Sequence, residues 1–482
     1  MDGDNVDLNG FIDKLLLRGS QSGMTEIEFL EAEIRAWLHS ERRSWMLAGA
    51  QYYRQHMDID VKERRAIGDN GKTRPLHNLP NFRIGYNRYA KLVDQKVNYL
   101  LAKPFEVKTD DETYGKRLDE IFNRVFRRRL KNVGVDAMNS GIAYLHPYVS
   151  DGKLQFKRFP ARQVLPFWAD EEHETLDAFL RMYAVITYEG KMPKTIYKAE
   201  YYTTNGIKYY VWDNDRLLPD VEQNDSAYLM IDDEPMNWER VPLIAFKYNA
   251  HEIPLICRVK CLQDALNTLL SNFADVMTED IRSTVLVIKN YDGQDLSEFR
   301  RNLQVYGAIK VRTLDGIDGG VETLTIDVNA ENYSVIIKCL EKAIIDVGHG
   351  FDASDDRMSN NPNKMNISSI YSNIDIDTNN VEMEFQASLQ QLMWFVDTFL
   401  RIGGQESDTV EFIFNRDTPV NESEIITNCR NSVGIISKET IVANHPWTKD
   451  TADELKRLEA EQAADVGIDY AAAQSQKVGN DE

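Results

Sequence analysis

The sequence predicts an α+β protein that is mainly helical. Along most of the second half, apolar residues recur every three or four positions, which is the period of an amphipathic helix. Residues 141–250 change to alternating, β-branched runs that are separated by turn dipeptides. The chain has 482 residues, of which 43% are hydrophobic and 10% aromatic, so it can build sizeable cores. A disordered protein is therefore excluded.

Three helical regions are predicted before residue 141. The first covers 25–56, where apolar residues recur at helical spacing. The second begins near Tyr86 and stops before Pro104, because proline disfavours helix in the residue that precedes it. The third covers roughly 113–140. Residues 57–82 are polar and contain two prolines, so we expect a loop there.

Two β-hairpins are predicted in the middle of the chain. They cover 142–159 and 195–212, and their turns are Asp151-Gly152 and Asn205-Gly206. Dipeptides of this type favour the two-residue turns that join antiparallel strands. The first half is therefore expected to be a mixed α/β domain.

Residues 255–283 and 331–349 are predicted to form two long helices. The first has apolar residues at alternating spacings of four and three, which suits packing against another helix. These packing positions are Leu255, Val259, Leu262, Leu266, Leu269, Phe273 and Val276. An ordinary core helix fits the same spacing equally well. The 47 residues between the helices, 284–330, suggest a small strand–helix–strand–strand unit that is short for an independent core.

A polar loop is predicted after the second long helix, over 350–370. It contains Gly, Asn and Pro but few apolar residues, and such a loop is either functional or disordered. The segment 371–402 follows, and its helix is expected to start near residue 378. A strand over 409–415 and a mainly helical end with a frayed tail complete the chain.

The stretch Ala66–Thr73 resembles a phosphate-binding loop and is the strongest candidate nucleotide site. Gly71, Lys72 and Thr73 occupy the key places of that motif. The motif needs a buried strand before it and a helix after it, so that backbone N–H groups meet the phosphates. A charged stretch precedes it here, and Pro75 disfavours the helix. We therefore do not expect nucleotide binding.

No catalytic residue, metal site or cofactor site is predicted. The histidines form no cluster, and no nucleophile with a matching base emerges from the spacing. Asp352, Asp355 and Asp356 are acidic neighbours, but they lack the spacing of a calcium loop, which favours a solvated acidic loop. The four cysteines have no CxxC pair, which favours reduced thiols over a metal or disulfide site.

The densest basic run lies within the predicted helix 113–140. It consists of Arg124, Arg127, Arg128, Arg129 and Lys131. Apolar residues interleave at helical spacing, which favours an amphipathic helix with a solvated basic face over a face that contacts phosphates. The whole chain has a net charge of −21, which argues against a protein that coats nucleic acid. No apolar run is long enough to span a membrane.

The layout resembles the portal proteins, or head-to-tail connectors, of long-tailed double-stranded DNA bacteriophages. Three stretches carry the resemblance in order along the chain. They are IGYNRYAKLVDQKVNYLLAKPF at 84–105, LLSNFADVMTEDIRSTVLVIKNYDG at 269–293, and the stretch 434–461 with ISKETI and DELKRLEAE. The resemblance implies a structural protein that forms a homo-oligomeric ring, usually dodecameric, around a channel for DNA.

The resemblance also implies a division of the chain into the portal parts. These are a wing (1–254, with the long helix of 371–402), a stem (255–283 and 331–349), a clip (284–330), a tunnel loop (350–370), and a crown with the C-terminal tail (403–482). In this reading the candidates for contact with channel DNA are Arg357, Asn360, Asn361, Asn363 and Lys364.

The implied location is the portal vertex of the virion capsid, with assembly in the host cytoplasm. The implied partners are further copies of the chain, double-stranded DNA, the terminase large subunit, scaffold and major capsid protein, and a head–tail adaptor, with no membrane and no cofactor. Two alternatives stay open: a non-viral helical assembly scaffold, and an enzyme that binds nucleotide at Lys72 and Thr73.

Overall fold

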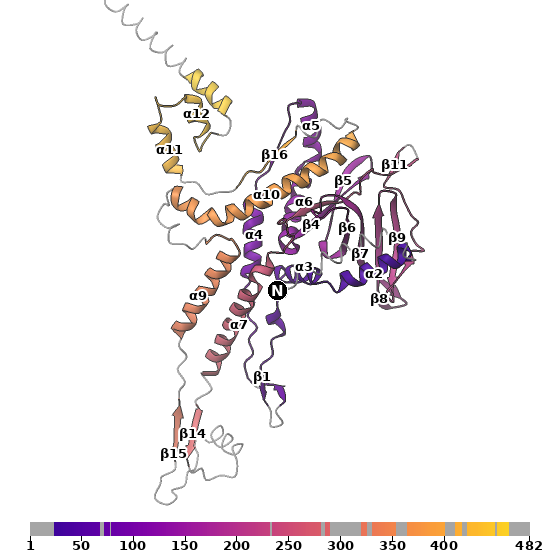
Figure 1. Ribbon diagram of the computed structural model, residues 1–482. Coiled ribbons are helices and arrows are strands. Elements are labelled where there is room, and N and C mark those ends of the chain that lie inside the picture. Colours follow the sequence, from indigo (N-terminus) through magenta and orange to yellow (C-terminus); the bar gives the residue numbers. More distant parts are fainter. Residues whose placement is uncertain are drawn as a thin grey trace, which may run out of the picture. The chain divides into compact units, whose positions relative to one another are not determined.

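The structure is a computed structural model with an α+β fold (Figure 1). It describes residues 24–67, 72–77, 79–231, 234–280, 285–289, 320–324, 330–352, 364–400, 410–416, 422–448 and 451–461. The chain divides into two compact units. The first unit comprises Met1–Gly348 and Asn379–Asn415, and the second comprises His349–Thr378 and Arg416–Glu482.

Two helices replace the single helix predicted over 25–56. They are α2 (Glu26–Leu38) and α3 (Glu41–Tyr53). The break occurs because Ser40 caps the second helix: its hydroxyl accepts a hydrogen bond of 3.2 Å from the Arg43 N–H. The prediction of one continuous helix was wrong, since apolar spacing alone does not reveal a capping serine.

The same correction applies to the helix predicted over 113–140. It consists of α5 (Glu112–Ile121) and α6 (Arg124–Ser140), and it follows α4 (Arg88–Leu101). Asn123 begins α6, because its side-chain oxygen accepts hydrogen bonds from the N–H groups of the second and third residues that follow. The end of α4 before Pro104 agrees with the prediction.

Two antiparallel sheets form the middle of the first unit. The three-stranded sheet has the order β13-β4-β5, and the five-stranded sheet has the order β10-β9-β8-β7-β6. The strands are β4 (Ile142–Ser150), β5 (Lys153–Phe159), β6 (Val164–Trp168), β7 (Leu176–Glu189), β8 (Met192–Thr203), β9 (Gly206–Asp213), β10 (Arg216–Pro219) and β13 (Ile244–Lys247). Both predicted hairpins are confirmed, with Ser150 opposite Lys153 and Thr203 opposite Gly206.

Strand β7 was not predicted, although it is the longest strand that the structure describes. Three consecutive residues, Ala178, Phe179 and Leu180, are buried near its start. Both faces of the strand are therefore covered there, and the alternation that identifies a half-exposed strand is lost. Helix α2 contributes Leu30 and Ile34 to the core on one face of this sheet.

Small elements complete the first unit. Strand β3 (Glu106–Lys108) pairs with β16 (Glu411–Ile413) beside an aromatic cluster around Phe105. The remaining elements are η1 (Asp58–Val61), η2 (Ala161–Gln163), β1 (Arg65–Ile67), β2 (Thr73–Pro75), β11 (Leu229–Ile231) and β12 (Glu234–Met236). The 57–82 segment thus contains short elements rather than only loop.

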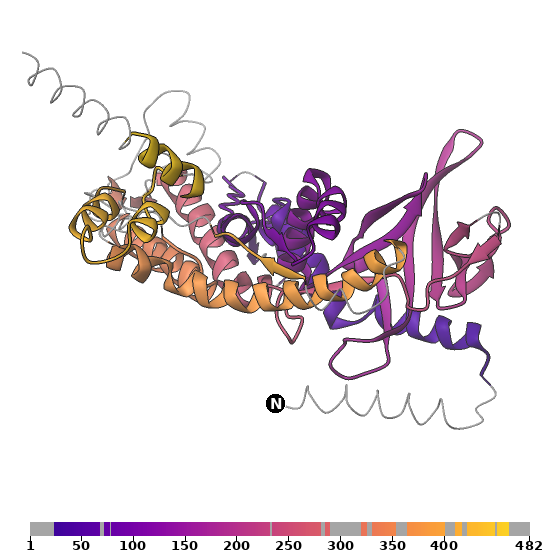
Figure 2. The same cartoon turned by 90° about the horizontal axis from the view of Figure 1, so that it is seen from above.

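Two long helices are present where the sequence predicted them. They are α7 (Ile256–Asp280) and α9 (Ala330–Val347), and Figures 1 and 2 show them side by side. Between them in the chain, β14 (Val285–Lys289) pairs antiparallel with β15 (Gly320–Leu324). The helix and the second strand of the unit predicted over 284–330 lie outside the described residues.

Helix α10 (Lys364–Leu400) begins well before the predicted start near residue 378. Residues 364–370 are therefore helical and do not belong to a loop over 350–370. The buried side chains of Ile367, Ile370, Tyr371 and Ile374 follow helical spacing. Ser, Asn and Asp residues between them hid this pattern, because they are poor helix formers.

The second unit also contains three short helices. They are α11 (Glu422–Asn431), α12 (Lys438–Ala443) and a helix over 451–461. Ser437 caps α12 through a hydrogen bond of 3.2 Å from the Thr440 N–H, in agreement with the helical end that the sequence predicted.

Candidate functional site

The two long helices contact each other along their length, and side chains from other elements tie them to the rest of the first unit. The rings of Phe273 on α7 and Tyr333 on α9 lie 4.9 Å apart between centroids. Arg88 at the start of α4 forms an ion pair with Glu341 on α9. This helix pair is the candidate functional site, because it carries the predicted packing positions.

The predicted packing positions differ in burial along α7. Leu255, Val259 and Leu266 are fully buried in the main core of the first unit. The other four, Leu262, Leu269, Phe273 and Val276, are half-buried. We call this row of packing positions the apolar seam. It lies in the core at its start and is only partly covered towards its end.

A row of buried polar side chains lies beside this apolar seam. It consists of Gln263, Asn267, Ser271 and Asp275, which follow one another at intervals of four residues. Residues four apart share one face of a helix, so these groups form a single line along α7. We call this line the polar ladder.

The polar ladder binds the backbone of an irregular segment, residues 80–87, that leads into α4. Asp275 accepts the Phe82 N–H at 2.6 Å, Ser271 the Ile84 N–H at 2.9 Å, and Asn267 the Tyr86 N–H at 3.0 Å. Gln263 accepts the N–H groups of Arg88 and Tyr89 and donates to the Tyr86 carbonyl. Every second N–H of the segment is thus satisfied by a side chain of α7.

This arrangement explains why polar residues interrupt an otherwise apolar helix. Segment 80–87 is in none of the described sheets, so its N–H groups need other partners. The ladder was not predicted from the sequence, because the segment has no periodic pattern that would reveal its course. The signal that was present is the four-residue spacing of the ladder residues themselves.

A second polar group anchors the base of α7. The Lys260 ammonium lies 2.5 Å from an Asp58 oxygen and 2.8 Å from an Asp264 oxygen, and the Tyr52 hydroxyl donates to Asp264 at 2.6 Å. Burial opposes the charge of Lys260, but hydrogen bonds to Asp264, Asp58 and Tyr52 raise its pKa above the ordinary value. Lys260 is therefore a permanent cation that joins α7 to η1.

Apolar side chains on the outer surface of the two helices remain exposed in the single chain. They are Met277 on α7 and Val335, Ile336 and Val347 on α9, with exposures between 43 and 55%. Exposed apolar side chains of this kind are one feature of surfaces that contact other molecules.

Most candidates for contact with channel DNA cannot be placed. Arg357, Asn360, Asn361 and Asn363 lie outside the described residues. Lys364 is the first residue of α10.

The candidate phosphate loop does not have the required structure in its described part. Thr73 begins strand β2, which pairs antiparallel with β1, so no helix starts at the position where the motif needs one. The N–H groups of a helix N-terminus are therefore missing from Lys72 and Thr73.

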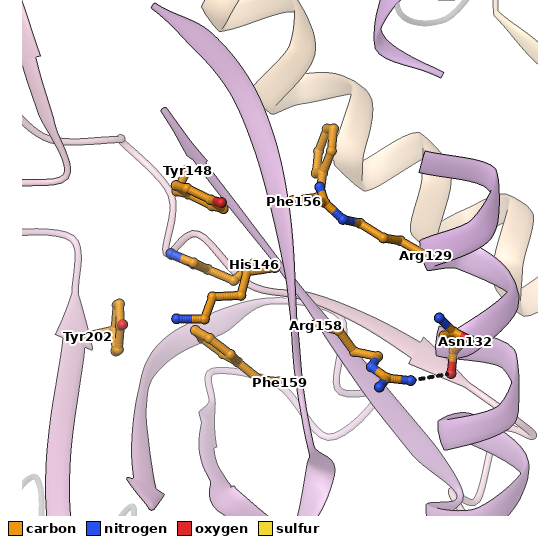
Figure 3. A pocket seen from close by; sticks show the side chains of 9 residues that line it. Arg129, Asn132, His146, Tyr148, Phe156, Arg158, Phe159 and Tyr202 are labelled. Atoms are coloured by element: carbon orange, nitrogen blue, oxygen red, sulfur yellow. Dashed lines mark hydrogen bonds between the residues drawn. The ribbon is translucent and has the colours of Figure 1, made fainter. Parts of the chain in front are cut away.

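The basic run of α6 has the amphipathic character that the sequence predicted. Phe122, Phe126 and Leu130 are buried, whereas Arg124 and Arg128 are exposed. Arg129 points to a cavity of about 540 Å³ between α6 and the β4–β5 hairpin (Figure 3). The cavity is lined by Arg129, Asn132, His146, Tyr148, Phe156, Lys157, Arg158, Phe159 and Tyr202.

His146 in this cavity is an uncharged residue. Burial lowers its pKa from about 6.5 to about 4, although a hydrogen bond to the Pro242 carbonyl favours the charged form. Its ring stacks on Phe159 with centroids 5.0 Å apart. The histidine is therefore a core residue, and the charges of the cavity come from Arg129, Lys157 and Arg158.

Comparisons with known proteins agree with this architecture. None of the helices in the described residues has the length and apolar character needed to cross a lipid bilayer. The portal protein of Bacillus phage SPP1 is 28% identical over 428 residues, which cover 86% of this chain and 83% of that protein. The portal protein of Clostridium phage phiCD119 is 26% identical over 464 residues, or 92% of this chain and 99% of that protein. The family described as "Phage portal protein, SPP1 Gp6-like" matches residues 38–467, and the chain therefore belongs to this portal family.

Proposed function

We propose that the chain assembles into a closed homo-oligomeric ring at one vertex of a phage capsid. Double-stranded DNA passes through the central channel of this ring when the genome is packaged and when it is ejected. Membership of the portal family across residues 38–467 supports this role. The observation from the structure that carries it is the pair α7 and α9, whose outer apolar side chains remain exposed in a single chain.

The parts of the ring follow from the order of the elements. We assign α7 and α9 to the stem, residues 284–330 to the clip, 1–254 and 371–402 to the wing, and 403–482 to the crown with its tail. The tunnel loop is assigned to 350–363, because α10 already begins at Lys364. The two strands β14 and β15 alone offer little apolar surface for a core, so neighbouring clips are expected to stabilise this part.

The partners are assigned by the role of a portal. Scaffold and major capsid protein join the ring during assembly, the terminase large subunit docks on it for packaging, and a head–tail adaptor replaces the terminase afterwards. The terminase supplies the ATPase, so the ring needs no catalytic residue. The hairpin geometry at Lys72 and Thr73 supports this division of labour.

Negative-stain electron microscopy with native mass spectrometry of the purified chain tests the proposal. We expect closed rings with a central hole and about a dozen subunits. If the chain stays monomeric or dimeric, even when scaffold and coat protein are present, the proposal is wrong. A Lys72→Ala variant is expected to assemble like the wild type. ATP hydrolysis by the wild type that this variant loses would contradict a purely structural role.

A further inference from the structure

A second cavity adjoins the one beside Arg129. Its volume is about 630 Å³, and it lies between the α5–α6 corner, the β4–β5 turn and the end of α10. The two cavities share Arg129 and Phe156 as lining residues, so they are neighbours, and we treat them together as one groove. We call this groove the basic groove, because its lining contains five cations and one acid. The cations are Arg117, Arg129, Lys153, Lys157 and Arg158, and the acid is Glu120.

Most cations of the basic groove are not neutralised within the chain. Arg158 pairs with Asp136 at 3.2 Å. Among the described residues, the side chains of Arg117, Arg129 and Lys153 have no hydrogen-bond or ion-pair partner, and the Lys157 ammonium lies 5.7 Å from the centre of the Phe159 ring. A concentration of unpaired positive charge on a chain of net charge −21 indicates a negatively charged occupant.

The rest of the lining distinguishes a protein occupant from duplex DNA. Ile121, Val125, Leu154, Phe399 and Leu400 provide an apolar wall. Phosphate groups gain nothing from such a wall, and cavities of this size are too small to admit a double helix. An acidic segment of a protein that also buries methylene groups fits both the charges and the wall.

The chain itself has an acidic loop of this kind, between β6 and β7. Glu171, Glu172 and Glu174 are exposed, and their carboxylates have no partner among the described residues. The loop backbone is firmly held: Asp170 accepts the N–H groups of Glu174 at 2.8 Å and Thr175 at 2.6 Å.

Contacts with neighbouring residues also hold this loop in place. Lys247 donates to the Glu172 carbonyl at 2.6 Å. His173 stacks on Trp168 with centroids 4.9 Å apart, and its Nδ1 lies 2.6 Å from an oxygen of the buried Glu252. The glutamates are therefore presented on a preorganised turn, which lowers the entropy cost of binding.

We infer that the acidic loop of one copy occupies the basic groove of the next copy in the ring. The inference rests on the proposed ring and names a contact within it. A ring needs a head-to-tail interface, in which two different surfaces of each copy meet. One groove and one loop per copy satisfy every interface of such a ring.

Charge reversal on each side tests the pairing. The groove variant is Arg129→Glu with Lys157→Glu, and the loop variant is Glu171→Lys with Glu172→Lys. Each is expected to raise the protein concentration for half-assembly by about tenfold, because like charges then face each other across every interface. Combining all four changes should restore assembly to within about threefold of the wild type. Native mass spectrometry across a concentration series measures the concentration for half-assembly of each variant.

Arg124→Glu with Arg128→Glu is the matched control. Both arginines are exposed on α6, but neither lines either cavity, so this variant should assemble like the wild type. Circular dichroism melting of each variant at low concentration verifies that the monomer folds. Higher ionic strength should weaken wild-type assembly, since it screens exposed charges.

Three outcomes overturn the inference. The first is that wild type and groove variant form rings equally well. This result would overturn the inference but not the proposed ring. The second is a groove defect that the loop reversal does not repair, which means that a different acidic segment binds there. The third is a groove variant that forms normal rings but no longer packages DNA, which means that the groove binds the phosphates of DNA. A wild type that forms no rings refutes the proposed function itself.

Discussion

The side-chain oxygen of Asn267 accepts a hydrogen bond of 3.0 Å from the backbone N–H of Tyr86. Asn267 is fully buried, so its side-chain oxygen is shielded from water. Replacing Asn267 by Leu should lower the free energy of unfolding by about 1–3 kcal/mol, because the Tyr86 N–H is left without a partner. Urea unfolding of the monomer measures the change. Asn272→Leu makes the same chemical change at an exposed position of α7 and should cost little.

Gly141 and Gly152 offer a matched pair of glycines with positive φ, at +78° and +68°. Alanine at Gly152 meets no atom within 4 Å, so it should cost only the strain of the left-handed conformation, about 1–2 kcal/mol. A Cβ at Gly141 would lie 1.8 Å from the Glu252 carbonyl oxygen, which is backbone. Gly141→Ala should therefore prevent stable folding, whereas Gly152→Ala should not. Equal melting temperatures for the two variants would contradict this account.

Phe385 joins α10 to the three-stranded sheet, where its ring meets that of Phe246 edge to face at 5.1 Å. It is fully buried. Phe385→Ala should lower the free energy of unfolding by about 3–5 kcal/mol, because it leaves a cavity in the core. Met383 lies two residues earlier and is 60% exposed, so Met383→Ala serves as the control. Thermal unfolding of both variants should separate them clearly; similar melting temperatures would mean that α10 does not pack as described.

His146 should make the stability depend on pH in a defined window. Its pKa is lowered by burial to about 4 in the folded chain, against about 6.5 when unfolded. Between these values the unfolded state binds a proton that the folded state does not, so stability falls as the pH decreases from about 6.5 to about 4. The loss should approach about 3 kcal/mol below that window. His146→Phe should flatten this part of the profile in urea titrations at several pH values. An unchanged slope would show that His146 titrates normally.

The tunnel loop should matter for DNA and not for assembly. Deleting residues 353–362 removes Arg357, Asn360 and Asn361 but leaves α9 and α10 intact. We expect rings of normal subunit number that fail to package DNA in an assay with terminase and ATP. A deletion of this kind that still packages at the wild-type rate would remove the proposed role of the loop.

The elements that the sequence predicted well are those whose pattern is local. Helices α4, α7 and α9 and the two hairpins follow from apolar spacing and from turn dipeptides. The breaks at Ser40 and Asn123 were missed, because an apolar stripe continues across them while the capping side chain ends the hydrogen-bond series. Cap residues should therefore be weighed against a continuous stripe when helix ends are assigned.

The candidate site was less predictable, because its parts are distant in sequence. The apolar seam of α7 could be found from the helix alone. The polar ladder required knowledge of where residues 80–87 run, and no local pattern contains that information. The basic groove combines α5, α6, β5 and the end of α10, so only the run of arginines on α6 was visible in advance.

The polar ladder also joins two repeats of unequal length, one along the extended segment and one along the helix. Two residues of extended chain advance about 6.6 Å, whereas four residues of helix advance about 6 Å. Each step between rungs therefore adds an offset of about 0.6 Å, and the three steps from Phe82 to Arg88 accumulate about 2 Å. The side chains take up this offset, since the four N–H···O distances all lie between 2.6 and 3.0 Å. The four-residue spacing of polar residues on α7 thus sets the register in which the segment runs along the helix.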